Sequence, residues 1–276
     1  GWTYTISPTT FSELRAGYVR TLLVRDPPTS GADLDRLNYP AIIPRVQFPS
    51  HQIADFGELG GGQTVDGGLH TISLHESITK IQGNHTLKFG GEVWTIRRNR
   101  FQFGGLSGAF AFNRDLTNNP QAPQTTGYGV ATFLLGAVNA GNLTVGSKRH
   151  ERGKYFAGFV QDDWRVAPRL TLNVGMRYDV EQPRWEQNNA QNGFDPFTIN
   201  PVSNTPGVLT FSGRDGLSKY AHRWDKNNIA PRFGFAYRMP GDKTVLRGGY
   251  GLMYGPIYDA SVGRVMQASF TDTRTF

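Results

Sequence analysis

The sequence has 276 residues, among them 34 Gly, 18 Phe, 11 Tyr and 5 Trp, and its formal net charge is +7. This length suits one large domain or two small ones. The absence of cysteine excludes a disulfide scaffold, a thiolate zinc site and a cysteine nucleophile. The positive charge raises the question of nucleic acid. The basic residues are scattered, however, except for the short run 97–100, so we expect no nucleic-acid partner.

Glycine and aromatic residues in this abundance favour many strands and turns over a helical bundle. The longest apolar stretch, 128–138, is far shorter than the ~20 residues of a transmembrane helix. A barrel spans a membrane with strands of about 9–11 residues and gives only a weak hydropathy signal.

The first two hairpins are predicted from short turns with alternating sequence beside them. Ser7-Pro8-Thr9-Thr10 separates predicted strands at 2–7 and 10–20, and Gln82-Gly83-Asn84 separates strands at 69–79 and 85–97. In the fourth strand, Leu87, Phe89 and Val93 fall on one face, and Lys88, Glu92 and Trp94 fall on the other. A period of two indicates a strand with one apolar and one polar face.

The next two hairpins follow the same pattern. Ala167-Pro168-Arg169 separates predicted strands at 153–166 and 169–180, and Met239-Pro240-Gly241-Asp242 separates strands at 229–238 and 243–255. The sequence therefore predicts about eight strands.

Long polar segments at 21–68, 98–152 and 181–228 connect the hairpins and are too long for ordinary compact connections. Within them, 130–135 is predicted to form a helical turn or a strand. Short turns at one end and long loops at the other are typical of an antiparallel transmembrane β-barrel with periplasmic turns and extracellular loops. A sheet in lipid must close, because lipid offers its edges no hydrogen-bond partners.

Several segments resemble a known family. The most specific is 159–166 followed by 168–178, and 85–92, 243–251 and 133–136 add to it. Together, over nearly the whole chain, they resemble the barrel of TonB-dependent receptors, in particular the Oar-like group. The resemblance implies a 22-stranded barrel with an N-terminal plug, located in the bacterial outer membrane.

This sequence has no plug, no TonB-contacting segment and fewer than half of those strands. We therefore expect residues 1–276 to form one partial barrel domain, an internal part of a larger barrel. The resemblance implies that the parent binds a scarce extracellular ligand, such as an iron chelate, a vitamin or a glycan, and imports it when TonB pulls on the plug. The implied partners are outer-membrane lipid, the plug, TonB and that ligand.

We expect no catalytic residue, no metal ligand and no cofactor, and therefore no enzyme. Asp162 and Asp163 are adjacent in a strand and point to opposite faces, so they do not converge on one site. The six histidines lack metal-ligand spacing. Ligand contacts are expected in the long loops, at residues that the sequence does not identify. The residues predicted to face the lumen and contact a plug are Arg177, Asp179, Arg232, Arg238 and Arg247.

Three alternatives remain open on the sequence alone. The chain could be a small complete barrel that acts as a passive channel or adhesin, which would require closure with matched shear. It could be a soluble all-β carbohydrate-binding module whose aromatic faces pack on one another. A β-rich hydrolase is the third, although no catalytic constellation supports it.

Overall fold

The computed structural model describes residues 1–123, 125–220, 223–241, 243–255 and 272–275. The chain divides into two compact units. The first comprises Gly1–Thr21, Leu69–Arg98 and the described part of His150–Ala268, and the second comprises Leu22–Gly68, Asn99–Arg149 and the described part of Ser269–Phe276. Within the described residues, no helix has the length and apolar character needed to cross a membrane.

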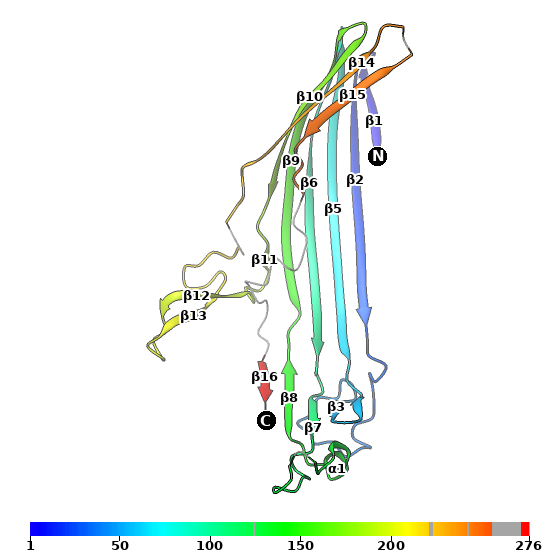
Figure 1. Cartoon of the computed structure of the whole chain (residues 1–276). Helices are drawn as coiled ribbons and strands as arrows, with labels where there is room; N and C mark the ends of the chain where they lie inside the picture. The colour runs from blue at the N-terminus through cyan, green and yellow to red at the C-terminus, as the bar shows by residue number, and fades with distance from the viewer. Residues whose placement is uncertain (124, 221–222, 242, 256–271, 276) are drawn as a thin grey trace. The chain divides into compact units, whose positions relative to one another are not determined.

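The largest sheet is antiparallel, in the order β1-β2-β5-β6-β9-β10-β14-β15, and β11 adds to β9 (Figure 1). Within the described strands β1 and β15 form its two edges, so the sheet is not closed. Its strands are β1 (Trp2–Ser7), β2 (Thr10–Arg25), β5 (Gln63–Gln82), β6 (His85–Gly104), β9 (Arg149–Ala167), β10 (Leu170–Glu181), β11 (Trp185–Glu186), β14 (Asn228–Arg238) and β15 (Val245–Gly251).

The register of this sheet separates an apolar face from a polar one. Val174 pairs with Asp162 on β9 and with Phe233 on β14, and Met176 pairs with Val160 and Pro231. Val174 and Met176 are 48% and 50% exposed, whereas Asp179, of opposite parity, is 2% exposed. A sheet that exposes its large apolar side chains and covers its charged ones has the pattern expected of a barrel wall in lipid.

The second unit contains a five-stranded sheet in the order β16-β8-β7-β3-β4. The strands are β3 (Ser50–Ile53), β4 (Gly57–Leu59), β7 (Ala109–Phe112), β8 (Ala140–Val145) and β16 (Asp272–Thr275), and β3 pairs with β7 in parallel. The helix α1 (Gly129–Leu134) packs on β3 and β7. A Cβ atom at Gly129 would lie 2.5 Å from the Ala54 carbonyl oxygen, so glycine allows this close approach.

The second unit has a hydrophobic core that includes Leu34, Ile53 and Phe112, all less than 5% exposed. His51 lies within it among aromatic rings. The Phe48 and Phe133 ring centroids are 5.2 and 5.7 Å from that of His51. The Tyr39 hydroxyl is 2.9 Å from His51 Nε2, and desolvation lowers the pKa of His51 below its ordinary value. This unit is thus a folded body rather than an irregular loop.

The eight predicted strands are all present. Four are longer than predicted by five residues or more: β5 and β6 have 20 residues each, β9 has 19 and β2 has 16. The last predicted strand, 243–255, is shorter, because β15 covers only Val245–Gly251. The short turns lie where predicted, although Asp242 of the fourth is outside the described residues. The long segments hold structure that was not predicted, including β3, β7, β8 and a separate hairpin of β12 (Asn192–Ile199) and β13 (Pro206–Phe211).

Candidate functional site

The candidate site is a group of charged side chains on the polar face of the first unit. β10 supplies Arg177 and Asp179, β6 supplies Glu92, and β9 supplies Tyr155. The side chains of Asp179, Glu92 and Arg177 are 3%, 16% and 20% exposed. Charges that are covered to this extent on a sheet face require partners there.

Arg177 is the centre of this group. Its Nε donates to Asp179 Oδ1 at 2.9 Å, and one terminal nitrogen donates both to the Tyr155 hydroxyl at 2.9 Å and to Glu92 Oε1. Tyr155 donates in turn to Asp179 Oδ1. The network therefore links three adjacent strands by charge-assisted hydrogen bonds, which are stronger than neutral ones.

One acceptor in the network has no donor. Asp179 Oδ1 receives two donors, whereas Oδ2 is buried and has no hydrogen-bond partner among the described residues. A buried carboxylate oxygen without a donor is costly.

Two other predicted residues, Arg238 and Arg247, line a cavity of about 590 Å³ on the same face, next to the short turns. Arg165 and Arg169 also line it, and among the described residues no carboxylate does. Four guanidinium groups around one cavity favour an acidic or carbonyl-rich occupant.

The structure places all five predicted residues on the polar face but in three separate positions. Arg177 and Asp179 belong to the network, and Arg238 and Arg247 belong to the cavity. Arg232 lies apart, opposite Gly175 and Gly251, and its Cγ would be 3.3 Å from a Cβ atom built on Gly251. Contact of these residues with a plug remains a prediction.

The sequence had placed Glu92 on the polar face but had not singled it out, and it missed Tyr155, Arg165 and Arg169. The signal that could have found Tyr155 is the alternation of faces along a strand. Tyr155 pairs with Glu181, which is two residues from Asp179 and therefore on the same face. Asp162 and Asp163 do point to opposite faces, since Asp162 contacts His85 at 2.7 Å on the apolar face and Asp163 accepts from Asn173 at 2.6 Å on the polar face. No group of acidic or histidine side chains among the described residues could hold a metal ion.

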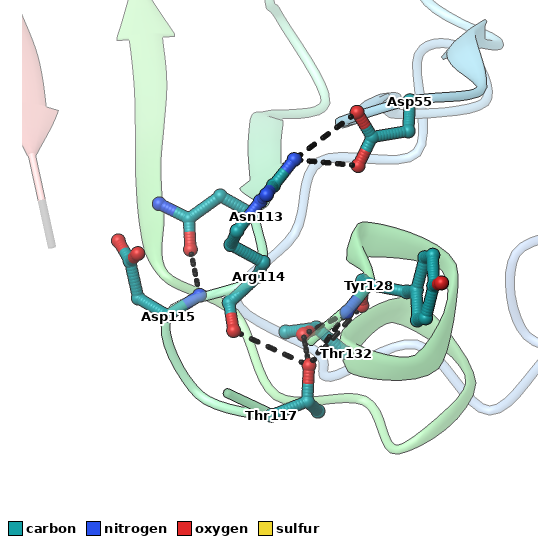
Figure 2. Close-up of polar contacts among 7 residues, drawn as sticks. All are labelled: Asp55, Asn113, Arg114, Asp115, Thr117, Tyr128 and Thr132. Carbon is teal, nitrogen blue, oxygen red and sulfur yellow. Dashed lines mark hydrogen bonds and ion pairs between the residues drawn. The ribbon is translucent and has the colours of Figure 1, made fainter. Parts of the chain in front are cut away.

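A second polar cluster lies in the second unit and fastens the segment before α1 (Figure 2). Arg114 contacts both carboxylate oxygens of Asp55 at 3.5 Å. The Thr117 hydroxyl bonds to the Arg114 carbonyl, the Tyr128 backbone and the Thr132 hydroxyl at 3.1–3.3 Å (Figure 2). These groups satisfy one another, so this cluster is structural.

The comparisons with known proteins agree with the fold. The family model described as "Outer membrane beta barrel domain" matches residues 1–276. Searches of curated proteins and of solved structures found no match.

Proposed function

We propose a transport role for this chain, which belongs to the outer-membrane β-barrel domain family and lies in the bacterial outer membrane. The proposed role is that of the barrel wall in a TonB-dependent receptor of the Oar-like group. The receptor would import a scarce extracellular ligand, such as an iron chelate, a vitamin or a glycan, and we assign it no catalytic chemistry. Membership of this family sets aside the alternative of a soluble carbohydrate-binding module.

The observation that carries the proposal is the cavity on the polar face that the guanidinium groups of four arginines line. In a barrel this face points to the lumen. An open channel would leave these groups to water, whereas an acidic or carbonyl-rich domain inside the barrel would accept hydrogen bonds from them. This supports a plugged barrel over a passive channel.

The folded second unit offers a further argument. Two of its three segments are the first two long loops, and such loops are extracellular in outer-membrane barrels. A rigid body in that position suits ligand capture, because binding residues on a fixed scaffold lose less entropy on binding.

The test uses the intact protein purified from outer membranes. We expect it to bind the purified periplasmic domain of TonB from the same cell, and to give no steady conductance in a planar bilayer in potassium chloride. Steady conductance without TonB binding would instead establish a passive channel. The absence of both conductance and TonB binding would favour an adhesin, and either result would refute the proposal.

A further inference from the structure

The apolar face of the first unit carries a groove of about 390 Å³, here called the glycine groove. Gly91 on β6 and Gly158 on β9 form its floor, and Leu74, Val93, Phe156 and Tyr178 are among the side chains that line it. A Cβ atom at Gly158 would meet nothing nearer than 3.9 Å, so the space there is open. Because this face contacts lipid in a membrane barrel, the groove has the shape and polarity to receive an acyl chain.

The groove lies at the end of the apolar band. On the face that includes Phe89 and Val93, the band of β6 runs from 85 to 93, and on β9 it runs from 166 to 156. These stretches are nine and eleven residues long, and they include the contact of His85 with Asp162 toward the short turns. A membrane-spanning strand needs about 9–11 residues. The glycine groove is thus at the membrane boundary on the side of the long loops, which is the outer leaflet.

Basic side chains follow directly beyond this boundary. In the direction of the long loops, Lys154 lies two residues beyond Phe156 on β9, and Arg152 lies two residues beyond Lys154. On β6, Arg97 lies four residues beyond Val93 in the same direction, and all three basic residues share the face of these apolar ones. Arg97 and Arg152 are close enough for their charges to repel each other. Within the described residues, neither Arg97 nor Lys154 forms an ion pair.

We define the basic rim as Arg97, Arg152, Lys154 and Lys219. The aromatic residue Trp185 lies beside two members of this rim. Trp185 pairs with Arg152, and Lys219 Nζ lies 4.3 Å from the centre of the Trp185 ring. Aromatic residues at the level of the headgroups are typical of membrane boundaries. Glu186 attracts Arg152, but it is 2% exposed.

Backbone groups already hold that carboxylate in place. Glu186 accepts from the backbone N–H groups of His150, Asn188 and Ala190 at 2.7–2.9 Å. The terminal nitrogens of Arg152 donate to the Glu151 carbonyl at 2.9 Å and to Gln187 Oε1 at 2.5 Å. The rim is therefore a positioned cluster with a net positive charge. Glu76 also lines the groove, and its carboxylate accepts a hydrogen bond from the Ser12 hydroxyl. Along β5, Glu76 lies two residues closer to the short turns than Leu74.

We propose that this part of the barrel wall binds a phosphorylated glycolipid of the outer leaflet. One acyl chain occupies the glycine groove, and the phosphates contact the basic rim. The two features are adjacent, in the order that such a lipid presents its tail and its headgroup. This inference rests on membership of the outer-membrane barrel family and not on the proposed import function.

The test titrates the intact, delipidated protein with lipid A that carries two phosphates, and follows binding by native mass spectrometry. We expect the double variant Arg97→Gln/Lys154→Gln to bind at least ~10-fold more weakly, the equivalent of about 1.4 kcal/mol. The control Lys80→Gln/Lys243→Gln removes the same charge from two exposed lysines beside the short turns and should stay within ~2-fold of the native protein. If the two double variants weaken lipid A binding equally, the basic rim is not the binding site and the proposal is refuted.

Two further measurements keep the test independent of folding defects in the double variant. Removal of both phosphates from the lipid A should weaken its binding to the unaltered protein by the same factor. Gly158→Leu, which fills the groove, should weaken binding of acylated lipid A but leave folding intact, as judged by heat-modifiable migration on gels. If dephosphorylated lipid A binds the unaltered protein equally well, the basic rim does not recognise phosphate and the proposal fails.

Discussion

Replacement of Arg177 by methionine tests the network on the polar face. Methionine keeps much of the volume of the side chain but removes its charge and its donors. Glu92 and Asp179 then lose their common cation while their side chains remain 16% and 3% exposed. Tyr155 still donates to Asp179 Oδ1, but Oδ2 has no donor among the described residues in either case.

The expected cost follows from that burial. Removal of one partner from a buried ion pair costs roughly 3–5 kcal/mol, because a charge is left without compensation. Arg177 is one-fifth exposed and Tyr155 remains, so we expect a loss near the lower end, about 3 kcal/mol. A second substitution, Asp179→Asn, removes one of the stranded charges and should recover about 1 kcal/mol of that loss.

The assay is equilibrium urea unfolding of the intact protein in lipid vesicles, followed by tryptophan fluorescence. Arg15→Met is the matched control, since Arg15 bonds to Glu13 across the same spacing of two residues but is 64% exposed. Exposed ion pairs contribute little to stability, so we expect no measurable change for the control. If Arg177→Met changes the free energy of unfolding no more than Arg15→Met does, the network is an ordinary surface pair and our reasoning is wrong.

Three further predictions concern single positions. Gly90→Ala should block folding, because the added Cβ would lie 2.3 Å from a backbone oxygen, whereas Gly158→Ala should fold normally; heat-modifiable migration on gels distinguishes them. Thr132→Val removes a fully buried hydroxyl that bonds to Thr117, so hydrogen exchange should show the second unit weakened by about 1–2 kcal/mol and the large sheet unchanged. Desolvation lowers the pKa of His51, so its unfolded form binds a proton first as the pH falls through 6.5. Protection of the backbone amides in 48–53, taken relative to the intrinsic exchange rate at each pH, should therefore fall as the pH is lowered from 7.5 to 5.5. A His51→Phe variant that shows the same fall would contradict this assignment.

The hairpins of the large sheet could be predicted because both of their signals are local. A period of two fixes the faces, and Pro, Gly, Asn or Asp fixes the turns. The strand ends were harder to predict, because 66–68 and 97–100 interrupt the alternation with glycines and charges. The sheet of the second unit was missed for a different reason. Its strands are three to six residues long, and Ser50 pairs with Ala109 across a long stretch of sequence.

The candidate site shows the same limit. Parity placed Arg177 and Asp179 on the polar face, but it could not tell which residues of β6 and β9 lie beside them. That depends on the register between β6 and β9, and the segment joining these strands folds as part of the second unit. The ring contact of Trp94 with Tyr155 and the Arg98–Glu151 ion pair reveal the register only in three dimensions.

The register also connects the two faces of the wall. Glu92 lies between Gly91 and Val93, and Asp179 lies between Tyr178 and Val180, so the network stands directly behind the glycine groove. Glycines leave a strand with few side-chain contacts of its own and weaken it. At this level the bonds of Arg177 to β6 and β9 hold the strands together from the lumen side. The wall can therefore form a groove toward lipid at Gly91 and Gly158, because the hydrogen bonds of Arg177 on the opposite face stabilise the strands where these glycines provide no side-chain contacts.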